Sequence, residues 1–171
     1  QAVEHCPPQS PMSVELMLAI AEIDLNENRL DRAMARLVSA GEIIKQLPSS
    51  PHTQLMEAAR RYLKAGFLLA RGDTSAARDL FRRALELRTP LLPIDHLHLM
   101  RNRLMLARTE FLLKNYAASE QILREEIEIR EQSPNVSDAE LAVACSFLAE
   151  QYYLNGRLSE AEAVYERTLE L

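Results

Sequence analysis

The sequence is poor in the residues on which several classes of fold depend. Its 171 residues include 4 glycines and no tryptophan, aromatic residues make up 5%, and no run of alternating β-branched residues is bounded by turns. A β-sheet protein needs such runs. Leucine, alanine, glutamate and arginine are plentiful instead, and these residues favour helix. We therefore expect an all-α protein.

Cysteine is also scarce, and long apolar stretches are absent. Cys6 and Cys145 lie far apart and form no CxxC pair, so two reduced thiols are favoured over one bridge, which indicates a cytoplasmic protein. No apolar run reaches the length of a membrane span and no signal peptide is visible, so we expect no membrane partner. Because the chain starts at Gln1 rather than Met, we expect it to be a fragment of a larger protein.

Charge is distributed unevenly along the chain. Residues 1–86 hold eleven basic and eleven acidic side chains, whereas residues 87–171 hold nine and fourteen, which accounts for the whole net charge of −5. Phosphate backbones require a basic surface. We therefore expect no direct nucleic-acid contact through this region.

Residue patterns of known catalytic or metal sites are lacking. The sequence has no phosphate-binding loop, no nucleophile elbow and no HExxH motif. His96 and His98 stand two residues apart, so on a helix they point in different directions and chelate poorly. We interpret them as polar residues at a helix start. We expect no enzyme activity, no metal and no cofactor.

A pattern of small and large residues recurs four times, about every 42 residues. The small residues are Ala33, Ala77, Ser119 and Ala161, separated by 44, 42 and 42 positions, and the large apolar residues four positions later are Leu37, Phe81, Leu123 and Tyr165. An offset of four places both on one helical face. Such a period is typical of stacked helical arrays, which mostly bind other proteins.

Turn and proline signals divide each copy into two helices. The predicted first helices are 13–26, 54–70, 95–113 and 138–154, and the predicted second helices are 30–46, 75–88, 117–132 and 158–171. Asn26-Glu27-Asn28, Arg71-Gly72-Asp73, Lys114-Asn115 and Asn155-Gly156 are the predicted turns within the hairpins. The residues expected to cap helices after the prolines are Ser49, Ser50 or Thr53, then Asp95, then Ser137 or Asp138.

We expect one repeat domain at 13–171, preceded at 1–12 by the tail of an earlier repeat or a linker. Its repeats span about 13–47, 53–89, 95–133 and 137–171. In the last helix Val164, Leu169 and Leu171 have no following helix to cover them. Arrays normally cap such a face, so we expect either a longer parent array or self-association through the uncapped terminal helix.

The acidic run Glu125–Glu131 is expected to be a solvated helix face. Arg124 can pair with Glu128, and Arg130 with Glu126, at a spacing of four. Such exposed pairs contribute about 0.2–0.5 kcal/mol each.

The copies resemble the tetratricopeptide repeat. The fourth copy supplies that family's large–small pair, aromatic residue, glycine turn, alanine and second aromatic as Leu148-Ala149, Tyr152, Gly156, Ala161 and Tyr165. The resemblance implies a right-handed superhelix, or solenoid, of four antiparallel helix hairpins. It also implies a concave groove, lined by the first helices, that binds a protein or peptide.

The period is longer than the family's usual 34 residues and resembles two kinds of relative. Glu128–Glu131, followed by Ala161-Glu162, is similar to the kinesin-light-chain type, although the paired asparagines of that type are replaced by Leu104-Met105 and Ser146-Phe147. Ala70–Asp73 is similar to the sensor arm of bacterial transcriptional activators of the maltose-regulator type. The predicted function is a protein-interaction scaffold. The alternative is such an effector-sensing arm, which would hold a pocket between neighbouring hairpins.

The resemblance also assigns candidate groove residues by position. They are Tyr62, Leu69, Arg101, Leu104, Arg108, Phe111, Glu150 and Tyr153. Arg101, Leu104 and Arg108 share one helical stripe. Two guanidiniums beside a leucine suit an acidic peptide with an apolar anchor. The alternative is that these arginines only pair with Glu22, Glu110 or Glu150.

Overall fold

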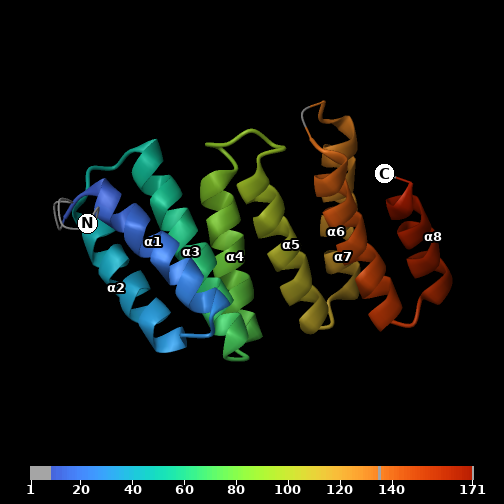
Figure 1. The fold of residues 1–171 in the computed structure, drawn as a ribbon, viewed down its shortest axis with the longest axis horizontal. Helices are drawn as coiled ribbons and strands as arrows, with labels where there is room; N and C mark the ends of the chain where they lie inside the picture. The colour runs from blue at the N-terminus through green and yellow to red at the C-terminus, as the bar shows by residue number, and fades with distance from the viewer. Residues whose placement is uncertain (1–8, 135, 171) are drawn as a thin grey trace. The chain divides into compact units, whose positions relative to one another are not determined.

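The computed structural model describes residues 9–134 and 136–170, so eight residues of the expected 1–12 tail lie outside the described part. The described residues form eight α-helices and no strand (Figure 1). The helices are α1 (Pro11–Asn26), α2 (Leu30–Gln46), α3 (Pro51–Ala70), α4 (Thr74–Arg88), α5 (Leu97–Leu112), α6 (Tyr116–Gln132), α7 (Asp138–Leu154) and α8 (Leu158–Leu169). None of these helices is both long and apolar enough to cross a membrane. The all-α prediction is confirmed.

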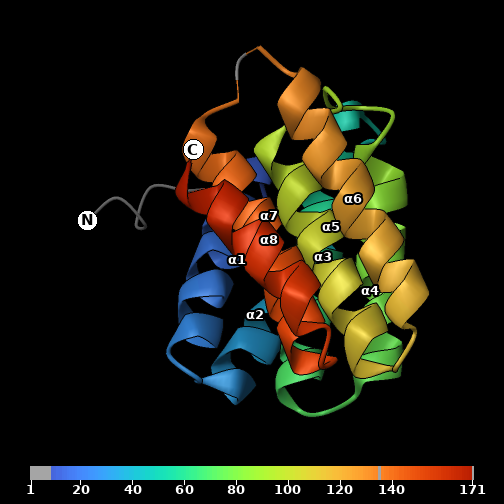
Figure 2. The ribbon, with the colours of Figure 1, turned by 90° about the vertical axis from the view of Figure 1, so that its right-hand side faces the viewer.

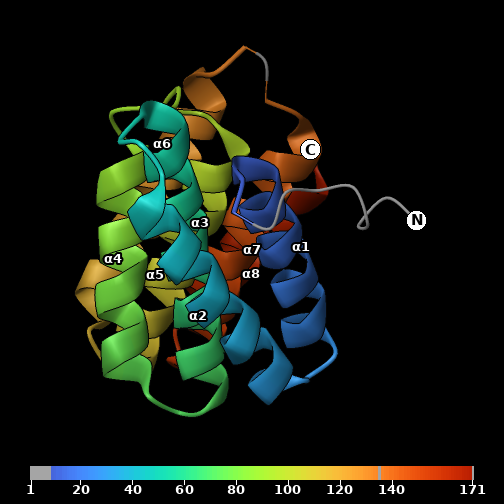
Figure 3. The ribbon, with the colours of Figure 1, turned by 90° about the vertical axis from the view of Figure 1, so that its left-hand side faces the viewer.

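The helices fall into two compact units. Unit 1 is Gln1–Leu91 and holds α1 to α4, and unit 2 is Leu92–Leu171 and holds α5 to α8. Consecutive helices pair as hairpins, and the second hairpin of each unit packs on the first. Figure 2 shows the α7–α8 hairpin of unit 2, and Figure 3 shows the α1–α2 hairpin of unit 1.

The four hairpin turns share one backbone conformation. Each contains one residue with a positive φ, and these residues are Asn28 (57°), Gly72 (84°), Lys114 (65°) and Gly156 (76°). The next N–H donates to a carbonyl near the end of the first helix, at 2.7–2.9 Å in all four turns. The left-handed residue turns the chain so that the next N–H pairs with a carbonyl that the helix end would otherwise leave unpaired. All four predicted turns are confirmed.

Helix starts follow the predicted caps at two of three proline links. The Ser50 side chain accepts from the Thr53 N–H at 3.1 Å, and Ser137 caps α7. The prediction of Asp95 as a cap is wrong. His96 caps α5 instead, and its Nδ1 accepts from the His98 N–H at 3.1 Å, because the turn after Pro93 delays the helix start to Leu97. The two histidines therefore serve the helix start.

The repeated small and large residues form the core of each hairpin. Ala33, Ala77, Ser119 and Ala161 are buried, as are Leu37, Phe81 and Leu123. Small residues allow two helix backbones to approach, and each fully buried large side chain contributes about 1.5–3 kcal/mol. Tyr165 differs, with 41% of its surface exposed. It lies on α8, which packs mainly on α7.

The acidic run on α6 is only partly a solvated face, so that prediction is wrong for Glu126. Glu126 and Arg130 are both fully buried, and Arg130 Nε donates to Glu126 at 2.5 Å. Arg103 of α5 donates to the same carboxylate at 2.7 Å, and Arg130 also approaches Glu140 of α7 at 3.4 Å. α6 packs against both α5 and α7, so this stripe of the run faces protein rather than water.

Candidate functional site

The candidate site begins with two arginines on the first helix of unit 2. Arg101 and Arg108 are both exposed on α5, and seven residues separate them by two helical turns, or about 10 Å of rise. Neither forms an ion pair within the described part of unit 2, so neither pairs there with Glu110 or Glu150. Their guanidiniums therefore remain available to a partner on this side of α5.

Leu104 does not lie between the two arginines as an exposed anchor. It is 4% exposed and belongs to a core cluster with Met100, Ala107 and Leu123. Although a spacing of three places Leu104 on the same side of α5 as Arg101, Leu104 lies at the edge of that side which packs on the neighbouring helices. An apolar side chain exposed beside the arginines is Leu112, which is 51% exposed and lies four residues after Arg108. The same i, i+4 spacing in the sequence could have identified it.

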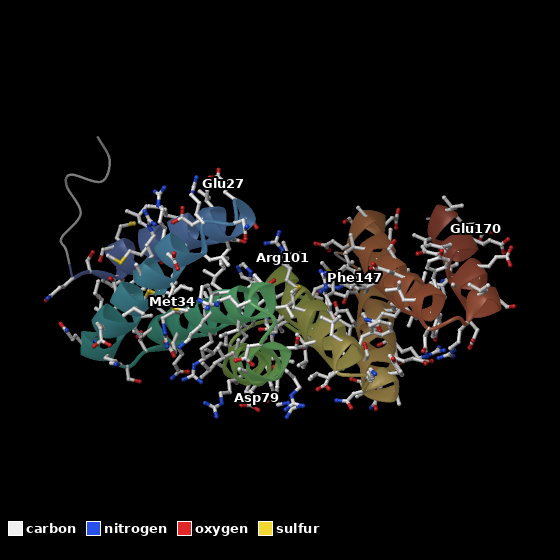
Figure 4. All side chains as sticks on the ribbon, turned by 90° about the horizontal axis from the view of Figure 1, so that it is seen from below. Glu27, Met34, Asp79, Arg101, Phe147 and Glu170 are labelled. Atoms are coloured by element: carbon white, nitrogen blue, oxygen red, sulfur yellow. The ribbon has the colours of Figure 1, made fainter. Side chains whose placement is uncertain are left out.

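The first helix of the second hairpin adds exposed apolar side chains. Tyr153 and Leu154 are each 61% exposed at the end of α7, and Val143 is exposed near its start. Glu150 is also exposed, whereas Phe147 is half-buried against the core. Figure 4 shows Arg101 on α5 and Phe147 on α7. Guanidinium, aromatic and aliphatic groups are thus all accessible on the first helices of this unit.

Phe111 takes part in packing at a hairpin turn. Its half-buried ring meets the Tyr116 ring edge-on, with 5.1 Å between the ring centroids. Such a pair adds about 0.5–1.5 kcal/mol beyond area burial. Phe111 therefore packs mainly within the α5–α6 hairpin, and only the remaining exposed part of its side chain is accessible to a partner.

The other two predicted residues, Tyr62 and Leu69, belong to α3 of unit 1 and are half-buried there. The Tyr62 ring packs edge-on against Phe81 with 5.3 Å between centroids, and the Arg88 guanidinium lies 5.1 Å from its centroid. Burial lowers the pKa of Arg88, and the neighbouring Tyr62 and Glu22 partly oppose this shift. Tyr62 thus helps to hold α3 on α4.

A polar network that the sequence did not reveal ties α6 to the α7–α8 turn. The Tyr152 hydroxyl donates to Glu120 at 2.7 Å, and Arg124 donates to Glu120 at 2.9 Å and to the Tyr152 oxygen at 2.7 Å. Arg157 also pairs with Glu120 and lies 4.2 Å from the Tyr152 ring centroid. The contacts that join α6 to Tyr152 and Arg157 span 28 to 37 positions, so no local sequence pattern predicts them.

The network sets the charge of its central carboxylate. Burial alone would raise the pKa of Glu120, but hydrogen bonds from Arg157, Tyr152 and Arg124 outweigh it and lower this pKa to about 2. Burial and the Glu120 contact raise the pKa of the Tyr152 hydroxyl. Glu120 is therefore ionised at neutral pH and holds two hairpins together. Within the described ranges, no group of three or more His, Cys, Asp or Glu side chains is placed to hold a metal ion.

Comparison with known families agrees with this geometry. The tetratricopeptide repeat family matches residues 55–132, which span α3 to α6 and include two of the left-handed turns. Residues 55–132 therefore carry tetratricopeptide repeats. The buried small residues and the turns of positive φ recur outside the matched segment, so the repeat pattern extends over α1–α2 and α7–α8 as well.

Solved structures with tetratricopeptide-like repeats share the fold. Two are crystal structures from Podosopora anserina described as a kinesin light chain with nearly identical TPR-like repeats, one of them a Q17M variant. Both are 17% identical to this chain over 98% of its length, and they give TM-scores of 0.78 and 0.75 with 78% and 79% of their own chains covered. At this identity the likeness shows the fold alone. The comparison with curated proteins gives no match.

Proposed function

We propose that this chain is a non-catalytic, cytoplasmic protein-interaction scaffold whose first-helix face in unit 2 binds a protein or peptide. Tetratricopeptide repeats generally mediate protein–protein interactions, and residues 55–132 match that family. The observation that carries the proposal is the pair Arg101 and Arg108, which are exposed and without an ion pair within the described part of unit 2. Arginine presents a planar fork that matches carboxylate geometry.

The partner we propose is an acidic segment that also carries apolar side chains. Two carboxylates about 10 Å apart would match the two arginines, a spacing that positions i and i+7 of a helix provide. Leu112, Tyr153 and Leu154 would bury apolar groups of the same segment. Aromatic and arginine side chains carry most of the energy in typical interfaces. Because the helices are already formed, the scaffold loses little conformational entropy on binding.

The test reverses the two charges. Wild type and the double variant Arg101→Glu/Arg108→Glu would each be used to capture proteins, and the captured proteins would be compared by quantitative mass spectrometry. The affinity of the captured partner for each form would then be measured by fluorescence anisotropy. Each lost charge-assisted hydrogen-bonding group costs about 1.5–3 kcal/mol. We therefore expect the dissociation constant to rise by about 100-fold or more.

The matched control is Lys45→Glu/Lys114→Glu, which reverses two exposed charges, one on α2 and one in the turn between α5 and α6. It should bind like wild type, and Arg101→Lys/Arg108→Lys should give an intermediate affinity because charge is kept but the fork is lost. Circular dichroism would verify the fold of each variant. If the reversed variant and the control bind a partner equally well, this face is not the binding face.

A further inference from the structure

Two large apolar side chains of α8 are exposed on one side of the helix. They are Tyr165 and Leu169, which lie four residues apart, and Leu169 is 87% exposed. Counted from the repeated small residue of each second helix, Tyr165 corresponds to Leu123 of α6, and Leu169 likewise corresponds to Ile127. Both α6 residues are buried in a core cluster that α6 shares with α7. This side of α8 therefore corresponds to the surface on which a second helix receives the first helix of the next hairpin.

α1 carries an apolar stripe that is exposed at both of its ends. The stripe consists of four side chains whose spacing places them on one side of the helix, namely Met12, Leu16, Ala19 and Ile23. Counted back from the left-handed residue of the following turn, the stripe corresponds to positions of α3 that include Met56 and Leu63. Both are buried in a core cluster that α3 shares with the preceding hairpin α1–α2. The stripe on α1 is therefore the surface with which a first helix packs on the hairpin before it.

Contacts between successive hairpins show which positions of these two surfaces meet. In unit 1, Gly41 of α2 faces Arg60 of α3, because a Cβ added at Gly41 would lie 3.1 Å from the Arg60 guanidinium. In unit 2, the Ser119 hydroxyl of α6 donates to the Gln151 side chain of α7. The equivalent pairs between α8 and α1 are both apolar, namely Leu169 with Leu16 and Ala161 with Ile23. An α1 helix that packed on α8 in the same manner would bury apolar groups from both sides.

An ionic contact at the edge of this interface has its equivalent as well. Glu120 of α6 pairs with Arg157, which follows the left-handed residue of the next turn. The equivalent residues are Glu162 of α8, which is exposed and has no ion pair among the described residues, and Arg29, which is partly exposed. Arg157 holds a second carboxylate at the same time, so the present ion pair of Arg29 with Asp24 does not exclude a new one. The charges of the two surfaces are thus complementary at this position.

We propose that α8 of one copy binds α1 of a second copy of this chain, in the manner in which α6 packs on α7. Such a contact is heterologous, because it joins different surfaces of the two copies. A dimer formed in this way keeps one free α1 and one free α8, so association continues beyond two copies unless it closes into a ring. Neither Arg101 nor Arg108 takes part, so this contact does not depend on the proposed protein-binding face.

Two variants each block one of the surfaces. Met12→Arg/Ile23→Arg places charges on α1, and Tyr165→Arg/Leu169→Arg places charges on α8. All four side chains are exposed, so both variants should keep the fold, which circular dichroism would verify. In sedimentation velocity we expect the mass of wild type to rise with concentration and each variant to associate about tenfold more weakly or less. A wild-type chain that is still monomeric at about 1 mM would overturn the proposal, because its dissociation constant would then lie above that value.

Mixing the two variants distinguishes this contact from a symmetric one. The variant blocked on α1 keeps its α8 surface, and the variant blocked on α8 keeps its α1 surface. An equimolar mixture should therefore form dimers with one copy of each variant and no larger species. If α8 bound α8 of another copy instead, the variant blocked on α1 would associate like wild type by itself. That result, or a mixture that associates no more than its components, would overturn the proposal.

Single-site changes and controls test the specificity of the contact. Glu162→Lys should weaken association by about threefold, as expected for the loss of one exposed ion pair, and Glu125→Lys on α6 should not. Val38→Arg/Ile94→Arg adds charges at two other exposed apolar residues and should associate like wild type. Equal weakening by this control would overturn the proposal, because any added positive charge would then suffice. Arg101→Glu/Arg108→Glu should leave self-association unchanged.

Discussion

Two hairpin turns lead to predictions of opposite sign for protein stability, although the residues changed occupy equivalent positions. Lys114 and Gly156 occupy the same left-handed position of successive turns, with φ values of 65° and 76°. A side chain in this conformation places Cβ close to the following carbonyl oxygen, which costs about 1–2 kcal/mol. Lys114→Gly should therefore stabilise the protein, and Gly156→Ala should destabilise it.

The expected size follows from two opposing terms. Replacing lysine by glycine removes about 1–2 kcal/mol of strain, but it also makes the unfolded chain more flexible, which costs about 0.4–1 kcal/mol. The net gain for Lys114→Gly should be about 0.5–1 kcal/mol. Gly156→Ala should lose a similar amount, and because nothing beyond the adjacent residues lies within 4 Å of the added Cβ, no steric clash adds to the backbone strain.

Urea denaturation followed by circular dichroism measures both changes as shifts of the midpoint at constant slope. For a protein of this size the corresponding changes in Tm are about 2–4 °C per kcal/mol. Lys114→Ala is the control, because it removes the exposed side chain and keeps the strained backbone, so it should match wild type. Stabilisation by Lys114→Ala equal to that by Lys114→Gly would show that strain is not the cause.

Two further predictions concern the ionic groups of unit 2. Because the pKa of Glu120 is about 2 in the folded state against 4.5 for an ordinary glutamate, its contribution to stability is present above pH 4.5. The advantage of wild type over Glu120→Gln should therefore disappear as the pH falls from about 4.5 to 2, in urea titrations at each pH. Glu126→Leu leaves the buried Arg130 without its closest carboxylate and should cost about 3–5 kcal/mol in the same assay. Adding Arg130→Met to that variant should recover a large part of the loss.

Each of these two predictions has its own refuting result. A constant difference between wild type and Glu120→Gln from neutral pH to pH 2 would show that the carboxylate gains nothing from its partners. For the buried pair, strictly additive losses in the double variant would show that Glu126 and Arg130 do not interact. The exposed pair of Lys45 and Glu42 offers a reference, since its removal should change stability by less than about 1 kcal/mol.

Local patterns predicted the helices well because the signals that set them are local. Left-handed turn residues, prolines and the i, i+4 core spacing placed every hairpin, and helix ends fell within three residues of their expected positions. The cap of α5 was predicted at Asp95 instead of His96 because the preceding turn decides which of two adjacent polar residues caps the helix.

The candidate site was harder to predict, because exposure depends on contacts between distant segments. Leu104 and Arg101 are three positions apart, yet one is buried and the other exposed. In the sequence Glu126 resembles its solvated neighbours in the acidic run. It is buried only because α6 packs against both α5 and α7.

The buried charges of α6 have a consequence for how this array can evolve. Glu126 pairs with Arg103 of α5 and with Arg130 of its own helix, and Arg130 also approaches Glu140 of α7. One set of ion pairs therefore connects three helices. A hairpin that was duplicated or exchanged with another would carry a carboxylate or a guanidinium into an apolar interface without its counterpart. We therefore expect the repeats of unit 2 to be a matched set whose order along the chain is fixed, rather than interchangeable modules.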